Sequence, residues 1–203
     1  MAQWLSQYWY FVIVFFVVLA ATVFGMYKAS RAYKRHYELF RAEEEKAKHL
    51  SQLKQKFVPL TESAVDSAED GELLEGVALS YQFFLQKEVD MTAEFEKLPL
   101  QAQYIYTLDI FVSEGAILSE FYRNNGSELK RLIVPAFEAV GDNEAARLAA
   151  GLFDMFDEDS EVSVDRELIA ETDAEFSEHF DKEKFKSKAA EYIRKNKSAL
   201  LQK

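Results

Sequence analysis

The chain has 203 residues and a formal net charge of −11, and 49% of its residues are hydrophobic, enough for a packed core. It contains no cysteine, which excludes disulfides, thiolate nucleophiles and cysteine-bound zinc. The charge is divided: residues 1–27 carry none, residues 28–56 hold nine Lys or Arg against four Glu, and residues 57–203 hold 15 Lys or Arg against 31 Asp or Glu.

The first predicted element is a transmembrane helix over residues 8–27. This uncharged run of 20 residues matches the hydrocarbon core of a bilayer, which is roughly 30 Å thick. No Lys or Arg precedes the run, and it is longer than the core of a signal peptide, so an uncleaved anchor is favoured. The aromatic residues near its ends are typical of interfacial belts; they are Trp4, Tyr8, Trp9, Tyr10 and Tyr27.

Basic residues follow the apolar run at once, at Lys28, Arg31, Lys34 and Arg35. The positive-inside rule therefore predicts a single-pass protein of the cell (inner) membrane. Its amino terminus would lie outside and its carboxyl-terminal domain in the cytoplasm.

Residues 28–58 are predicted to form a basic helical stalk, because neither Gly nor Pro occurs between Lys28 and Pro59. Two interpretations of the stalk remain open. It could lie near anionic lipid headgroups, or it could form a short coiled coil whose seam is interrupted at Glu44 and Ser51. The apolar residues of the seam recur at spacings of three, four or seven and are Tyr33, Tyr37, Phe40, Ala47, Leu50, Leu53 and Phe57.

Residues 59–203 are predicted to form an acidic all-helical domain, since no convincing alternation of period two occurs. The apolar spacing predicts helices over 72–88, 100–123, 127–141 and 143 to about 156, and an amphipathic region over roughly 165–200. An exposed acidic loop is predicted over 154–165.

Several residues mark the ends and irregularities of these helices. Pro99 suits the start of the helix over 100–123, and the Ser127 hydroxyl is expected to cap the next helix. Pro135 is expected to kink that helix, and Gly141 fits a left-handed carboxyl cap.

The break at residues 124–126 has two interpretations. Asn and Gly tolerate positive φ, so the break is explained by a turn alone. It also adjoins acidic and aromatic side chains, which makes it a candidate interaction patch. That patch consists of Glu114, Gly115, Glu120, Phe121, Tyr122, Asn124, Asn125 and Gly126.

The order of these features resembles the carboxyl-terminal domain of the DNA mimic protein family, a domain of unknown function. The resemblance covers about residues 72–200 and lies in residues 114–115, 121–122, 124–126, 135–141, 173–176 and 192–196. It departs at residues 113–116 and at Glu120. The resemblance implies an acidic helical domain, and in the family's namesake such a surface imitates DNA and occupies a DNA-binding protein.

The sequence predicts no enzyme. The sequence has no Gly-rich phosphate loop, no nucleophile elbow and no His-Glu-x-x-His motif. His36, His49 and His179 stand in polar, charged surroundings, and the best calcium-loop candidate, from Asp157, has Val162 where Gly is required. We therefore expect no catalytic, cofactor-binding or metal-binding residue and no cofactor.

Two functions follow as expectations. In the first, an acidic domain tethered to the membrane through residues 8–27 binds a basic protein partner, whereas direct nucleic-acid binding is disfavoured by charge. In the second, the protein is a structural or assembly component of a membrane complex, and the anchor and stalk carry the specificity. The chain is also compatible with a homo-oligomer, and an unrecognised enzyme with a polar pocket around Tyr104, Glu114 and Tyr122 is the minor alternative.

Overall fold

The computed structural model describes residues 2–157 and 163–201, without the side chains of residues 2–13, 20, 21, 23, 25, 29, 30, 32, 34–36 and 39. Across these residues the chain is helical and contains no strand, which confirms the all-α fold class. The chain divides into two compact units, Met1–Ser51 and Gln52–Lys203.

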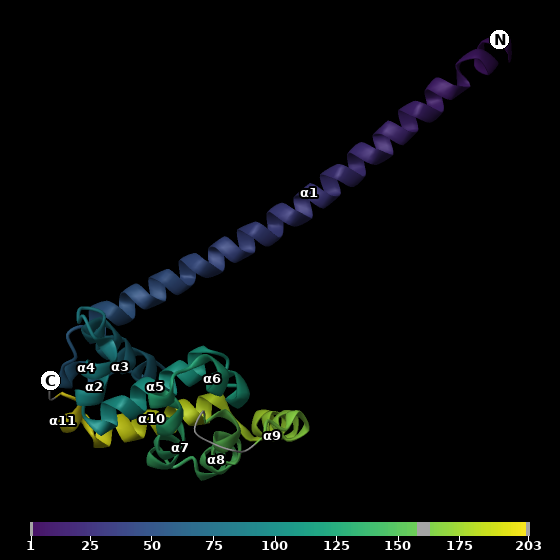
Figure 1. The fold of residues 1–203 in the computed structure, drawn as a ribbon. Coiled ribbons are helices and arrows are strands. Elements are labelled where there is room, and N and C mark those ends of the chain that lie inside the picture. Colours follow the sequence, from purple (N-terminus) through teal and green to yellow (C-terminus); the bar gives the residue numbers. More distant parts are fainter. Residues whose placement is uncertain (1, 158–162, 202–203) are drawn as a thin grey trace. The chain divides into compact units, whose positions relative to one another are not determined.

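The first unit consists of most of one long helix, α1 (Ala2–Phe57), drawn in purple and blue in Figure 1. Two ion pairs between neighbouring turns support it. Arg41 Nε lies 3.2 Å from Glu45 Oε1, and Lys48 Nζ lies 3.0 Å from Glu44 Oε1. Because these groups are exposed, each pair contributes only about 0.3–0.5 kcal/mol to the helix.

The membrane prediction is corrected by the structure. In the part of the chain that is described, no helix offers a stretch long and apolar enough to cross a membrane, whereas a crossing needs about 20 consecutive apolar residues. This finding contradicts the predicted single-pass location in the inner membrane and leaves the anchor over 8–27 without support. The side chains of residues 8–13, 20, 21, 23 and 25, including three of the predicted belt aromatics, lie outside the described residues.

The second unit begins within α1, before the predicted boundary at residues 58 and 59. Leu53 is 1% exposed and Phe57 is fully buried, so the last turns of α1 belong to the core of this unit. Gly76 of α3 (Asp70–Leu85) lets the Phe57 ring approach the helix backbone, because a Cβ at Gly76 would lie 2.3 Å from that ring. An ion pair of 2.6 Å between Lys56 and Glu72 joins the same two helices.

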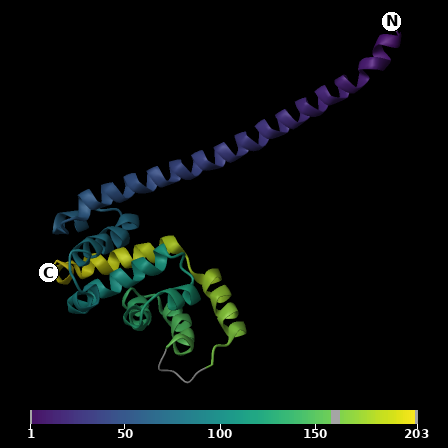
Figure 2. The ribbon, with the colours of Figure 1, turned by 45° about the horizontal axis from the view of Figure 1, so that its top comes forward.

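In the described part of the chain, ten further helices complete the second unit. Their arrangement is shown in Figures 1 and 2. Helix α10 packs against α3, α5 lies between α3 and α7, α7 packs on α8, and α9 contacts α6 and α8. Besides α3, they are α2 (Glu62–Ser67), α4 (Met91–Lys97), α5 (Leu100–Ser113), α6 (Leu118–Asn124), α7 (Ser127–Ala139), α8 (Asn143–Phe156), α9 (Arg166–His179), α10 (Lys182–Lys195) and α11 (Lys197–Leu200).

An aromatic cluster joins four of these helices. The Phe111 ring of α5 makes edge-to-face contacts with Phe121, Phe137 and Phe176, at centroid distances of 5.8, 5.2 and 5.5 Å. Phe180 follows α9 and contacts Phe111 at 5.8 Å. All of these rings except Phe180 are at most 2% exposed, so they form the centre of the core.

The predicted helix over 100–123 is in fact two helices, α5 and α6. Helix α5 ends in a Schellman motif, in which the Ala116 amide donates to the Phe111 carbonyl at 3.0 Å and the Gly115 amide donates to the Val112 carbonyl at 3.4 Å. Gly115 and Ala116 have φ values of 106° and 59°. The prediction failed because apolar periodicity continues across the break, although Ile117 is 40% exposed.

Other helix-end predictions have mixed outcomes. Gly141 has a φ of 77° and ends α7 as predicted, with Pro135 inside that helix. Ser127 does not cap α7; Gly126 occupies the cap position and Ser127 is the first helical residue. The predicted amphipathic region divides into α9, α10 and α11, because the Asp181 carboxylate accepts amide hydrogen bonds and starts a new helix at α10.

Candidate functional site

The predicted interaction patch lies around the turns that end α5 and α6. The Asn125 amide nitrogen donates to Glu114 Oε2 at 2.8 Å and to the Phe121 carbonyl at 2.9 Å. These bonds tie the two turns together. Glu114, Gly115, Glu120, Asn124 and Gly126 are exposed, so this part of the patch is accessible to a partner.

The two aromatic residues of the patch are not on the surface. Phe121 and Tyr122 are both fully buried. The Tyr122 hydroxyl donates to the Ala149 carbonyl at 2.9 Å, and its ring stacks on Phe156 with a centroid distance of 5.6 Å. Burial raises the pKa of Tyr122. These two side chains therefore hold α6 in the core, and a partner on the surface does not reach them; the binding role of the exposed residues stays a prediction.

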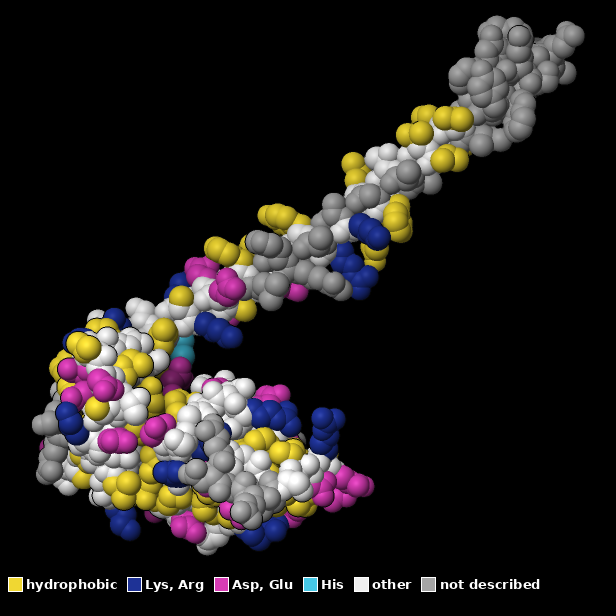
Figure 3. Space-filling view, viewed as in Figure 1, with side chains coloured by type: hydrophobic (Ala, Val, Ile, Leu, Met, Phe, Trp, Pro, Cys, Tyr) yellow, Lys and Arg dark blue, Asp and Glu magenta, His cyan; other side chains and the backbone are white. Residues whose placement is uncertain are grey.

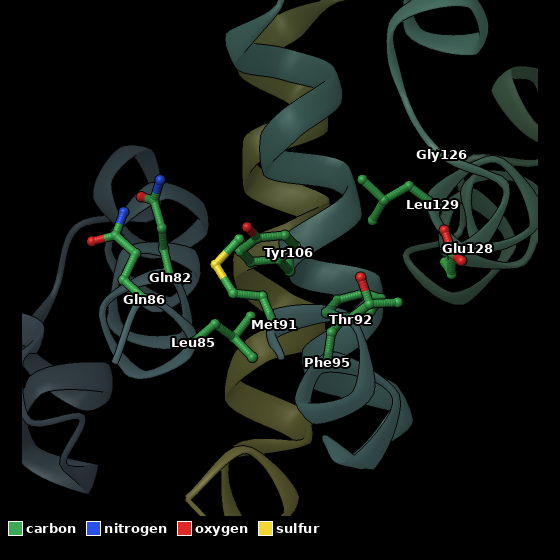
Figure 4. A pocket seen from close by; sticks show the side chains of 10 residues that line it. All are labelled: Gln82, Leu85, Gln86, Met91, Thr92, Phe95, Tyr106, Gly126, Glu128 and Leu129. Carbon is green, nitrogen blue, oxygen red and sulfur yellow. The ribbon is translucent and has the colours of Figure 1, made fainter. Parts of the chain in front are cut away.

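A pocket of about 340 Å³ opens next to this patch, between α3, α4, α5 and the start of α7 (Figure 4). Leu85 and Phe95 are 3% and 7% exposed and form its closed part, whereas Met91 is 53% exposed. The Phe95 and Tyr106 rings lie 5.4 Å apart. The apolar lining consists of Leu85, Met91, Phe95, Tyr106 and Leu129.

Four polar side chains and Gly126 line the rest of the pocket. Gly126 also belongs to the predicted patch, so the pocket extends the patch toward α4. In Figure 4 the amides of Gln82 and Gln86 lie on one side of Tyr106, and Glu128 lies on the other. Such a lining, apolar with a few polar groups, is typical of ligand and peptide sites.

Carboxylates gather on the chain segment that forms one wall of this pocket. Lys97 Nζ lies 2.6 Å from Glu94 Oε1, and its pKa is raised by that hydrogen bond and by the charges of Glu94, Asp90 and Glu88. One ammonium group therefore stands among three carboxylates. Hydrophobic and acidic side chains are visible side by side over the region of α3 and α4 in Figure 3.

A second unusual group is Asp109 on α5, for which the sequence predicted no role. Burial raises the pKa of its carboxyl to about 7; the charge of Glu75 on α3 adds to the rise, and Lys182 at the start of α10 opposes it. The same carboxyl contributes to the raised pKa of Tyr106, after burial of that ring. In the sequence, its position between Leu108 and Ile110 was the only available signal.

The structure does not assemble the residues of the predicted enzyme alternative in this pocket. Tyr104 and Tyr122 are not among the lining residues, and Glu114 is bonded to the Asn125 amide. Among the described residues, no group of three or more His, Asp or Glu side chains is placed to hold a metal ion. His179 is exposed at the end of α9, and Val162 of the calcium-loop candidate lies outside the described residues.

No protein-family model, no curated protein and no solved structure matches this chain. The resemblance to the DNA mimic protein family therefore stays a prediction. The geometry of the domain and its charge are the grounds on which a function can be proposed.

Proposed function

We propose that the acidic helical unit, Gln52–Lys203, is a protein-interaction module that binds a basic surface of a partner protein. The observation that carries the proposal is the charge of this folded unit, which holds 31 Asp or Glu against 17 Lys or Arg. A folded unit with an excess of 14 negative charges attracts basic proteins over distances of about one Debye length, roughly 8 Å at physiological salt.

The arrangement of the surface charges supports binding to a protein. Several cations are already engaged within the unit: Arg147 contacts Glu144 at 2.7 Å and Glu175 at 2.5 Å, and Lys197 contacts Glu62 at 2.7 Å. Because Asp and Glu outnumber Lys and Arg by 31 to 17 in this unit, its surface keeps an excess of carboxylates. Those carboxylates would meet Lys and Arg of a partner, and a nucleic acid would be repelled.

The test is capture from a native lysate with the full chain as bait, at low and at high salt, followed by mass spectrometry. We expect a basic protein that is retained at low salt and released at high salt. The purified partner should then bind the purified chain with a dissociation constant that rises with salt. If retention is independent of salt, or if the purified partner does not bind, the proposal is wrong.

The resemblance to the DNA mimic family gives this proposal a stronger form, in which carboxylates stand in for DNA phosphates. In that form the partner is a DNA-binding protein, and duplex DNA competes with the chain for it. If duplex DNA leaves the complex intact, the DNA-mimic form of the proposal is wrong, and the proposal of an acidic interaction module is unaffected.

A second candidate function places the specificity in α1. Tyr33, Tyr37 and Phe40 are 75%, 57% and 60% exposed and recur at spacings of four and three, a pattern typical of a helix that packs on another helix. Replacing residues 28–51 by an unrelated helical sequence separates the candidates. Binding that survives the exchange supports the acidic module, and binding that is lost supports α1.

A further inference from the structure

We propose that the pocket between α3, α4, α5 and α7 is the docking site for a peptide segment of the partner that carries one bulky apolar side chain flanked by Lys or Arg. This inference rests on the proposed function and names the site and the chemistry of its ligand. The proposed occupant is a basic peptide, and not a second copy of the chain or a small apolar molecule.

The apolar part of the pocket limits the size of the apolar side chain that the peptide inserts, its anchor side chain. Its volume of about 340 Å³ is near the lower end of ligand pockets, which span about 300–1,000 Å³. That volume accommodates one large side chain rather than a helix face. The buried side chains of Leu85 and Phe95 would contact the inserted side chain, and the exposed Met91 side chain is unbranched and adapts to different shapes.

The acidic residues near the pocket favour Lys or Arg on both sides of the anchor side chain in the peptide. Glu88 and Asp90 lie in the connection between α3 and α4, and Glu96 lies on α4 beside Phe95. Two cations on this side of the pocket are already engaged, since Lys97 pairs with Glu94 and Lys87 lies 4.5 Å from the Phe83 ring centroid.

On the opposite wall, Glu128 extends the negative charge to the start of α7. Within the described part of the chain, Glu88, Glu96 and Glu128 make no ion pair with a Lys or Arg. Glu128 lines the pocket, and Glu88 and Glu96 flank the lining residues of α4 in the sequence. These carboxylates would attract Lys or Arg residues beside an inserted side chain, whereas an acidic or phosphorylated ligand would be repelled.

The two features make separable contributions to binding. Burial of the anchor side chain slows dissociation, because its apolar contacts must be lost before the peptide can leave. The carboxylates raise the association rate and make it sensitive to salt.

The probe for the test is a fluorescein-labelled peptide in which Trp stands between two Lys-Arg pairs, titrated with the full chain and read by fluorescence anisotropy. We expect binding that weakens with salt, and binding at least about tenfold weaker for the peptide with Ser in place of Trp. Equal binding of the two peptides would overturn the pocket as an anchor site.

Variants of the chain locate the anchor. Thr92 is exposed at the pocket, so Thr92→Trp fills the pocket from its mouth without burying a new group in the core. It should weaken binding of the Trp peptide at least about tenfold. The matched control is Ser177→Trp, which adds the same ring at an exposed position of α9 and should leave binding unchanged. Thr92→Trp with wild-type affinity contradicts the proposal.

Charge reversal tests the flanks. Glu88→Lys combined with Glu96→Lys should lower the association rate about fivefold or more at low salt and flatten its salt dependence. The control, Glu171→Lys with Glu178→Lys, makes the same change of net charge on α9, where both residues are exposed. If both double variants slow association equally, the effect is one of total charge and the local site is wrong.

The outcomes distinguish this inference from the proposed function. If a partner binds in a salt-sensitive way and its binding is unaffected by Thr92→Trp, the acidic module is supported and the pocket is wrong as the docking site. Absence of both peptide binding and salt-sensitive capture removes both proposals. A change of oligomeric state in Thr92→Trp, measured by sedimentation, would show a second copy in the pocket and would also overturn the inference.

Discussion

Replacing Asp109 by Asn should stabilise the folded protein, and the gain should grow with pH. The carboxyl of Asp109 has a pKa of about 7 in the fold against an ordinary value of 3.8. The folded protein therefore binds this proton more tightly than the unfolded chain does. The stability that the protonated group contributes is fully present below pH 3.8 and is lost as pH rises through about 7.

The magnitude follows from the difference between the two pKa values. At about 1.36 kcal/mol per pKa unit, ionisation of Asp109 costs the fold about 1.5 kcal/mol at pH 5, about 3 kcal/mol at pH 6 and about 4 kcal/mol at pH 8. Asn has nearly the same shape and no proton to lose, so Asp109→Asn should remove this cost. Loss of the attraction to Lys182 reduces the gain, because that cation favours the ionised form.

The assay is urea unfolding of the full chain at several pH values between 5 and 8, with both proteins measured in parallel. The difference in free energy of unfolding should increase from pH 5 to pH 7 and then level off. Glu178→Gln, at an exposed position of α9, serves as the control and should show no such increase. Parallel stability curves for Asp109→Asn and the wild type would refute the argument that burial and Glu75 hold the proton on Asp109.

Three further substitutions test the packing and backbone of the second unit by the same unfolding assay. Gly76→Ala should destabilise the fold by about 1–3 kcal/mol, because its Cβ would overlap the fully buried Phe57 ring. Gly151→Ala, whose new Cβ would have no neighbouring atom within 4 Å, should stabilise the fold by about 0.5–1 kcal/mol. Equal effects of the two substitutions would contradict the close approach of Phe57 to Gly76. Ala116→Gly should stabilise by about 1 kcal/mol because residue 116 has a φ of 59°, and a loss of stability would show that the methyl group packs usefully. Tyr122→Phe should destabilise by about 1 kcal/mol through loss of the 2.9 Å hydrogen bond to the backbone of α8; an unchanged stability would mean that this bond has no net value.

Local signals in the sequence were sufficient for the helical class and for some helix ends. Gly141 was expected to end α7, and it does so with positive φ, because glycine has no Cβ to clash there. The start of α8 at Asn143 was also predicted, since a polar residue follows that glycine. The acidic character of the second unit is a property of composition alone.

Tertiary structure decided what local patterns could not. The aromatic pair at Phe121 and Tyr122 was predicted to belong to a surface patch, but both rings are buried because α8 and α5 cover them. The single predicted helix over 100–123 breaks at Gly115, where α5 ends in a Schellman motif and the chain turns into α6. Periodicity reports which residues are apolar, and it does not report where a helix must stop to pack.

The candidate site shows the same division between sequence and structure. The sequence by itself determined the excess of carboxylates, the lack of cysteine and the turn residues around Gly126. Only the folded chain places Gly126 beside Met91 and Phe95 in one pocket, and only the fold places Glu75 and Lys182 near Asp109. These juxtapositions depend on contacts between helices far apart in the chain, and such contacts are fixed by packing of the whole core.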